Sequence, residues 1–175
     1  MARFLDTTNY SVVETNHVAA VRTGQIKAQY PMSEDLKAVG AQNGQLLVVD
    51  DVAKEVGLPG DATAVAWLHA SEERLYESHL GRDKFIVTDP NYPRMMKLAV
   101  GDIFETDAVS ADISAEGFAD VAAVKSTAKV GVPSETGDIE LLTAAAGTEG
   151  VVLDIVEWVT LPNGKEGIKF AVAKA

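Results

Sequence analysis

The stretch of sequence that decides the fold is residues 150–173, which read GVVLDIVEWVTLPNGKEGIKFAVA. Two runs of β-forming residues, 152–161 and 168–173, flank a loop that has Asn163 and Gly164 at its centre. An Asn-Gly pair between alternating segments is the strongest short-range signal for a tight turn between antiparallel strands. We therefore expect a β-hairpin at the C-terminal end of the chain.

The alternation within each run predicts which side chains face the core. The first run has period-two character from Leu153 onward, which places Leu153 and Ile155 on one face and Trp158 on the other. The second run places three apolar residues on one face: Ile168, Phe170 and Val172. Lys169 alternates with these apolar neighbours, so we expect it to protect an exposed strand edge.

Further short strands are expected upstream of the hairpin. Asn43-Gly44 precedes the apolar run of residues 45–50, which predicts a turn and then a largely buried strand. Residues 62–70 form the next apolar run, and further strand candidates lie at residues 85–88, 95–100 and 103–106. Residues 51–56 read as one helical turn, and residues 71–78 read either as a helix start or as a surface loop. Residues 108–137 are the least informative, with a strand or a helix possible over 118–124.

These elements predict a mainly β protein, either a small antiparallel β-barrel or a sandwich. Residues 11–21 keep no clean period, and we expect residues 1–30 to form an extended N-terminal arm, or alternatively a loosely packed terminus. Residues 31–175 are expected to form a single β-rich domain. The one plausible boundary lies near Tyr30-Pro31.

Composition excludes several classes of protein. The 175-residue chain has 47% hydrophobic residues, a formal net charge of −11 and no cysteine. The absence of cysteine rules out disulfides and thiolate metal sites. The acidic balance argues against a nucleic-acid partner, which needs a basic face. No apolar run reaches the roughly 20 residues of a membrane span, and Asp6 interrupts any signal-like start, so we expect synthesis in a cytosol and no membrane partner.

The histidines offer the main candidate for catalytic or metal chemistry. His69 and His79 flank an acidic segment that contains Glu72 and Glu73, and imidazole with carboxylate suits zinc or iron. The spacing lacks the short repeat that places two ligands on one face of an element, so solvated surface residues are the preferred interpretation. Ser71 as a nucleophile is weaker still, because no Gly-x-Ser-x-Gly setting surrounds it.

A resemblance enters at residues 92–107, which read YPRMMKLAVGDIFETD. This block, together with residues 66–69 (AWLH) and 83–87 (DKFIV), is similar to small virion proteins of tailed bacteriophages. These are the head decoration proteins, also called cement or minor capsid proteins. The similarity covers about a third of the chain, and its motifs are loose.

The resemblance implies a non-enzymatic protein without cofactors that binds the outer surface of a phage capsid and stabilises it. Its partner would be the major capsid protein, with self-association on the capsid surface. Its location would be the virion, assembled in the host cytoplasm. We expect partner contacts at Tyr10, Val12 and Val13 in the arm, because an extended arm can add a strand to a neighbour's sheet. Trp67 is a further contact candidate, since a core or interface position suits it better than a platform for a small ligand.

Other functions remain open at this stage. Within the virion class, the alternative is a tail or head-completion protein. Outside it, the alternatives are a small metal- or ligand-binding β-barrel enzyme that uses His69 and His79, and a protein-interaction module unrelated to phages.

Overall fold

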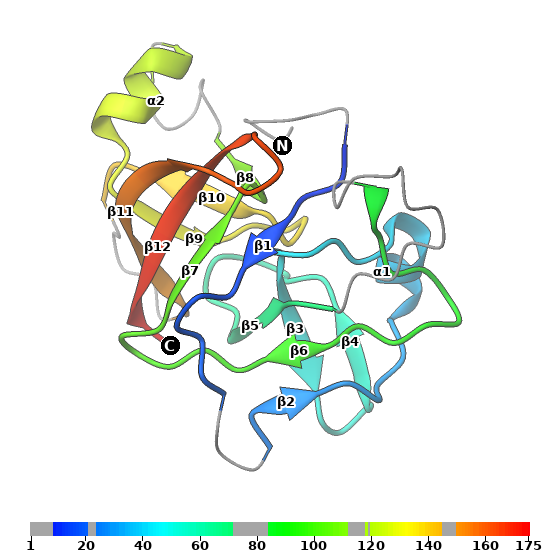
Figure 1. The fold of residues 1–175 in the computed structure, drawn as a ribbon. Coiled ribbons are helices and arrows are strands. Elements are labelled where there is room, and N and C mark those ends of the chain that lie inside the picture. The colour runs from blue at the N-terminus through cyan, green and yellow to red at the C-terminus, as the bar shows by residue number, and fades with distance from the viewer. Residues whose placement is uncertain (1–8, 21–23, 72–83, 112–117, 119, 145–149) are drawn as a thin grey trace.

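The computed structural model describes residues 9–20, 24–71, 84–111, 118, 120–144 and 150–175. The fold is mainly β, with 38% strand and 10% helix, as the sequence predicts. Two sheets, of seven and five strands, form a sandwich-like arrangement, and no closed barrel is present among the described strands. The two sheets occupy opposite sides of the view in Figure 1.

The larger sheet, called sheet A here, contains both termini of the described β structure. Its spatial order is β1 (Val13–Glu14), β7 (Ile103–Thr106), β12 (Glu166–Lys174), β11 (Val152–Thr160), β9 (Val130–Pro133), β10 (Ile139–Leu142) and β8 (Val109–Ser110). Neighbouring strands are antiparallel, except that β10 and β8 are parallel. Among the described strand pairs, the expectation of an antiparallel protein therefore holds except for β10 with β8; an isolated bridge between Met32 and Val56 is also parallel.

The predicted C-terminal hairpin is confirmed as β11 and β12, and it lies at the centre of sheet A. The pairing of the two strands shifts register between Ile155 and Glu157, which leaves Val156 as a bulge. The extra residue resets the alternation, so that Trp158 pairs with Ile168 and packs against the core. The predicted orientation of Trp158, opposite to Leu153 and Ile155, is therefore wrong, because a bulge adds one residue to a period of two.

The smaller sheet, called sheet B here, has the order β2 (Ile26–Lys27), β6 (Met95–Met96), β5 (Ala66–His69), β3 (Leu46–Asp50) and β4 (Glu55–Gly57). The strand expected over 45–50 is confirmed as β3, and the turn at Asn43-Gly44 precedes it with Gly44 at a φ of 89°. The helical turn expected over 51–56 is wrong, since β3 turns back into β4 there. The strand expected over 85–88 is reduced to one bridge between Val87 and Ala41.

Two short helices complete the described structure. Helix α1 (Glu34–Val39) begins after Ser33, whose side chain accepts a hydrogen bond from the Leu36 amide, and ends at Gly40. Its first turn carries Glu34 and Asp35, which suits the positive end of a helix dipole. Helix α2 (Val121–Thr127) begins after Asp120, so the helix alternative is confirmed for residues 121–124 of the ambiguous stretch. Neither helix is long and apolar enough to cross a membrane.

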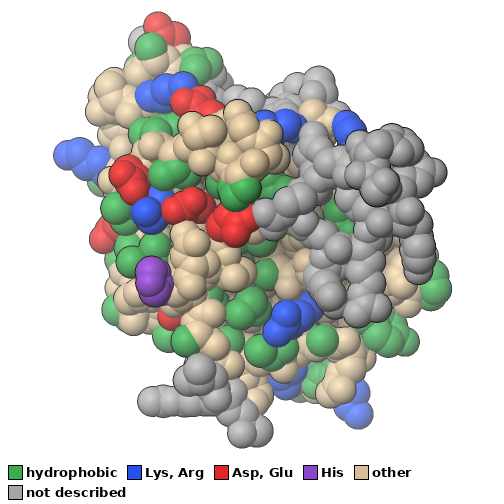
Figure 2. All heavy atoms as spheres, viewed as in Figure 1, with side chains coloured by type: hydrophobic (Ala, Val, Ile, Leu, Met, Phe, Trp, Pro, Cys, Tyr) green, Lys and Arg blue, Asp and Glu red, His purple; other side chains and the backbone are tan. Residues whose placement is uncertain are grey.

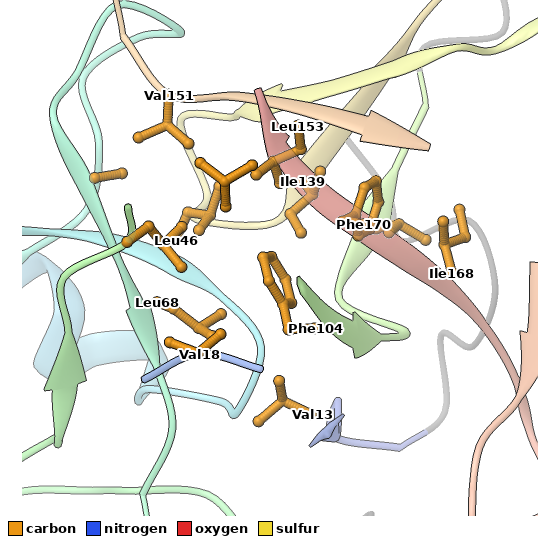
Figure 3. Packing of buried hydrophobic residues seen from close by; sticks show 14 of the residues in the cluster. Val13, Val18, Leu46, Leu68, Phe104, Ile139, Val151, Leu153, Ile168 and Phe170 are labelled. Atoms are coloured by element: carbon orange, nitrogen blue, oxygen red, sulfur yellow. The ribbon is translucent and has the colours of Figure 1, made fainter. Parts of the chain in front are cut away.

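Sheet B separates two hydrophobic clusters because the side chains of its strands alternate between faces. Leu46, Leu68 and Met96 face sheet A and join the larger cluster. Figure 3 shows Leu46 and Leu68 next to Phe104, with Ile139, Phe170 and Leu153 beyond them. The next residues along each strand of sheet B, Leu47, Trp67 and Met95, lie in a second cluster with Leu36 of α1.

The described part of the expected arm packs into this core. Val13 pairs with Thr106 of sheet A, and Ile26 pairs with Met96 of sheet B. Val13, Val18 and Ala20 belong to the larger hydrophobic cluster. Val13, Val18 and Ala20 therefore fill the same core as the body of the chain, whereas Tyr10 and the neighbours Asn16, His17 and Ala19 are exposed.

Candidate functional site

A polar network occupies the junction of the two sheets, with Asn43, Gln45 and His69 buried and its other members half-buried. We call it the polar seam. It consists of Gln42, Asn43, Gln45, His69 and Ser71. Backbone hydrogen bonds join the turn before β3 to the end of β5: Gly44 N–H donates to the His69 carbonyl at 2.8 Å, and His69 N–H donates to the Gln45 carbonyl at 2.8 Å. Gly44 is required here, because a Cβ at this position would lie 2.0 Å from Thr106 Oγ1.

The geometry around His69 determines its tautomer. His69 Nδ1 lies 2.8 Å from the backbone carbonyl oxygen of Gln42, which can only accept, so Nδ1 carries a proton. In the neutral imidazole Nε2 is then the acceptor. Ser71 Oγ lies 2.7 Å from Nε2 and therefore donates its hydroxyl proton to it. The sequence interpretation of His69 as a solvated surface residue is wrong, since its side chain is fully buried.

Burial lowers the pKa of His69 from 6.5 to about 4, and the hydrogen bond to Gln42 opposes that shift only in part. Bringing a charged imidazolium into the interior costs desolvation energy that one neutral hydrogen bond does not offset. His69 is thus neutral at physiological pH. The same desolvation makes it a poor acceptor for a proton leaving Ser71.

The serine is held on every side by backbone and side-chain contacts. Ser71 N–H donates to Asn43 Oδ1 at 2.7 Å, and Asn43 Nδ2 donates to the Ser71 carbonyl at 3.2 Å. Ser71 Oγ also accepts from the Arg94 amide at 3.0 Å. A serine nucleophile needs hydrogen-bond donors aimed at a developing oxyanion. The three donors beside Ser71, which are its own amide, Asn43 Nδ2 and the Arg94 amide, already form hydrogen bonds with other groups. The His69–Ser71 pair is therefore suited to bracing the end of β5.

The polar seam also connects to sheet A and to the N-terminal segment. Gln42 Oε1 accepts from the Ser11 amide at 3.1 Å. Gln45 Nε2 donates to the Thr136 carbonyl at 3.3 Å and to Asp138 Oδ1 at 3.4 Å, in the turn between β9 and β10. Because buried polar groups are costly unless paired, this network holds both sheets in one relative position.

A second feature is the turn between β3 and β4, residues 50–54, which we call the β3–β4 turn. Asp50 Oδ1 accepts from the amides of Val52 and Ala53 at 2.7 and 2.9 Å. Asp51 Oδ1 accepts from Lys27 Nζ at 2.7 Å and from the Tyr30 hydroxyl at 2.9 Å, and the lysine, followed by the tyrosine, lowers the pKa of this carboxyl. Val52, at the tip of this braced turn, is 94% exposed.

A third feature is a charged row on the outer face of sheet A. Lys169 Nζ lies 2.9 Å from Glu157 Oε1 and 3.2 Å from Glu105 Oε1, and these glutamates raise the pKa of the lysine. Lys125 bonds Glu166 at 2.7 Å and lies over the Trp158 ring. These contacts are on the other face of sheet A, the one that carries Ile168. Figure 2 shows acidic and basic side chains gathered over β12 and its neighbours. The prediction that Lys169 protects a strand edge is wrong, because β12 lies between β7 and β11 inside sheet A. The row is a set of exposed ion pairs, which add little to stability.

Two cavities are found among the described residues, and the first adjoins the polar seam, because Thr136, which accepts a hydrogen bond from Gln45, lines it. This cavity, of about 220 Å³, lies between the β4–β5 connection, which contributes Asp61 and Ala62, and the β9–β10 turn. Glu135 and Glu140 are among its lining residues. The other, about 410 Å³ and more open, lies beside Lys97 and Val100. Within the described ranges, no group of three or more His, Asp or Glu side chains could hold a metal ion.

The structure separates the site residues expected from the sequence. Tyr10 is 38% exposed, whereas Val12 and Val13 are buried at 3% and 6%. Trp67 is also buried, with Lys97 Nζ 5.9 Å from its ring centroid. The expectation that Val12, Val13 and Trp67 are free to contact a partner is therefore corrected: in this conformation they form core.

The alternative metal site at His69 and His79 lies only partly within the described residues. His79, Glu72 and Glu73 lie outside the described residues. Both ring nitrogens of His69 are engaged in hydrogen bonds, so His69 could bind a metal only by losing one of them. Sequence reasoning missed Val52, because the Asp50-Asp51 pair before it reads equally well as the start of a helical turn.

Comparisons with known proteins do not assign a family. No protein-family model, no curated protein and no solved structure matches this chain.

Proposed function

We propose that this chain is a structural protein of a tailed-phage virion that binds the outer surface of the capsid and stabilises it. Its partner is the major capsid protein, and its role is non-enzymatic. The sequence resemblance over residues 92–107 supports this proposal. In the structure this block runs from β6 of sheet B to β7 of sheet A and carries Met95, Met96 and Phe104 into the two cores. The resemblance therefore concerns residues that build the fold.

The observation that carries the proposal is the β3–β4 turn. Val52 is 94% exposed, yet the backbone around it is fixed by Asp50 and the turn is tied to Lys27 and Tyr30 through Asp51. Burying a valine side chain stabilises a contact by about 1.5–3 kcal/mol. A turn that is already rigid loses little conformational entropy when a partner covers it. Val52 is thus well placed to insert into an apolar depression of a partner protein.

The polar groups of the described chain support the same conclusion. His69, Ser71 and their neighbours are used to hold the two sheets together. A rigid two-sheet body with a projecting apolar residue is suited to reinforcing a shell. On a shell, many copies of a modest contact add up to tight overall attachment.

The test is co-sedimentation of purified protein with undecorated phage heads, with Val52→Asp as the variant. Val65→Asp is the matched control, because Val65 is 64% exposed on another loop and the charge change is the same. We expect the wild-type protein and Val65→Asp to saturate the heads at a fixed stoichiometry. We expect Val52→Asp to bind at least about tenfold more weakly, since a carboxylate replaces a buried apolar contact.

The outcomes test capsid binding and the role of the β3–β4 turn separately. Absence of binding by folded wild-type protein would overturn the capsid function. Equal binding by Val52→Asp would leave the capsid function standing but would remove the β3–β4 turn as the contact. Binding of only a few copies at one vertex would favour the head-completion alternative.

A further inference from the structure

The connection that follows β1 contains two unusual backbone conformations. Asn16 has a φ of 30° and Ala20 has a φ of 41°; among the described residues, the one other non-glycine residue with positive φ is Lys54. Asparagine tolerates this region, but alanine does not, because its Cβ approaches the carbonyl oxygen. Ala20 is therefore the strained position of the N-terminal segment.

The segment before Ala20 makes a compact set of contacts, and we call residues 11–18 the N-terminal plug. Val12 N–H donates to Asp107 Oδ1 at 2.7 Å, and its carbonyl accepts from Thr106 Oγ1 at 2.7 Å. His17 N–H donates to the Ile103 carbonyl at 3.0 Å. Val12, Val13 and Val18 are buried. The plug thus fills a fixed place beside β7, and the hydrogen bonds that hold it there join residues 12 and 17 to residues 103–107.

The plug is also at the edge of sheet A. Among the described strands, β1 is the terminal strand of that sheet and pairs with β7 alone, through Val13 with Thr106 and Glu14 with Glu105. An edge strand can leave a sheet without breaking any other strand pairing. The plug is therefore separable from the rest of sheet A.

We propose that two copies of this chain exchange their N-terminal plugs reciprocally, with Ala20 as the hinge. The plug of one copy then occupies the place beside β7 in the other copy. Each hydrogen bond and each buried valine of the closed monomer is reproduced between copies, so the exchange costs no contact within the plug. It relieves the positive φ of Ala20, and strain in a connecting segment favours such exchange.

The plug that fills the place beside β7 comes from a second copy of this chain, because the acceptors around that place match the amide donors of the plug. Asp107 Oδ1 is in position for the Val12 amide, and Gln42 Oε1 is in position for the Ser11 amide. The exchange goes beyond capsid binding and takes place in solution without a capsid. Close spacing of copies on any surface raises their effective concentration and favours it further.

The absence of natural cysteine makes disulfide mapping direct. Glu14 and Glu105 face each other across β1 and β7, so a disulfide between cysteines at these positions reports where the plug lies. We would mix the Glu14→Cys variant with the Glu105→Cys variant at high concentration, oxidise with glutathione disulfide, and identify linked peptides by mass spectrometry. The matched control mixture is Asp154→Cys with Ala171→Cys, opposite each other within the β11–β12 hairpin.

We expect a 14–105 linked dimer in the first mixture and background linkage in the control. Light scattering on the uncrosslinked wild-type protein should show a dimer fraction that rises with concentration. A linkage yield no higher than the control's, with wild-type protein monomeric at every concentration, would overturn the exchange.

Ala20→Gly tests the hinge. Glycine adopts positive φ without strain, so this change should lower the dimerisation constant by about fivefold for each hinge. Ala19→Gly is the matched control, because Ala19 is the exposed neighbour without a positive φ, and it should dimerise as the wild-type protein does. Equal dimerisation by Ala20→Gly and Ala19→Gly would contradict the assignment of Ala20 as the hinge.

Discussion

At pH 7 the imidazole of His69 is neutral, because burial holds its pKa at about 4. Its two nitrogens join the Gln42 carbonyl to the Ser71 hydroxyl, and the tautomer follows from the carbonyl's inability to donate. The residue is therefore a structural link between the turn before β3 and the end of β5. Its role depends on the interior around it, which no property of histidine itself reveals.

This link makes stability depend on pH in a definite direction. The unfolded chain takes up a proton on His69 near pH 6.5, whereas the folded chain does so only near pH 4. The unfolded state binds more protons between these values, so stability falls as the pH falls from about 6.5 to about 4. The loss amounts to about 3 kcal/mol for a group shifted this far.

Urea denaturation of the wild-type protein and of His69→Gln across this pH range measures the effect. Glutamine keeps a donor and an acceptor but does not titrate. The free energy of unfolding of His69→Gln should therefore fall by about 3 kcal/mol less than that of the wild-type protein over this pH range. Carboxylates contribute equally to both proteins and cancel in the comparison. Parallel pH profiles for the two proteins would show that His69 does not titrate as the structure implies.

At the scale of elements, the N-terminal segment differs most from its prediction, because the structure packs it against sheet A. Its lack of period suggests an arm, but Val12, Val13 and Val18 are buried against sheet A. A two-residue strand cannot show a period, because the alternation that predicts strands needs at least about four residues. Helix α1 was missed for a related reason: six residues offer too little pattern, although Ser33, Glu34 and Gly40 are recognisable helix boundaries.

We accordingly expect removal of residues 1–30 to destabilise the body. The deletion takes β1, β2 and several buried apolar side chains away from both sheets. Each fully buried valine contributes about 1.5–3 kcal/mol, which is a large part of the 5–15 kcal/mol typical of a domain. A lower thermal midpoint by circular dichroism is the expected result. A deletion variant as stable as the full chain would mean that the segment acts as a free arm.

At the scale of the whole molecule, one hydrophobic cluster spans both sheets. Leu46 and Leu68 of sheet B and Phe104 and Phe170 of sheet A belong to it, and the polar seam adds hydrogen bonds across the same junction. Neither sheet can expose its inner face to water without losing this shared core. The two sheets should therefore unfold together.

The two tryptophans allow a direct measurement, because Trp67 lies in sheet B and Trp158 in sheet A. We expect Trp67→Phe and Trp158→Phe, each retaining one fluorophore, to show fluorescence transitions that coincide with the circular dichroism transition of the same variant. Coincident probes are the mark of a single cooperative unit. A fluorescence midpoint well separated from the circular dichroism midpoint in either variant would indicate that the sheets unfold independently.

The sequence by itself determined the β class and the strongest local features, since these depend on contacts between near neighbours. The Asn163-Gly164 hairpin and the turn before β3 are examples, because a tight turn selects its residues locally. The burial of His69, the bulge at Val156 and the packing of Val13 were decided only by the tertiary structure. Each of them depends on residues far away in the chain, such as Gln42 for His69 and Thr106 for Val13. The exposure of Val52 belongs with these, because whether an apolar side chain meets solvent depends on what the remainder of the chain leaves uncovered.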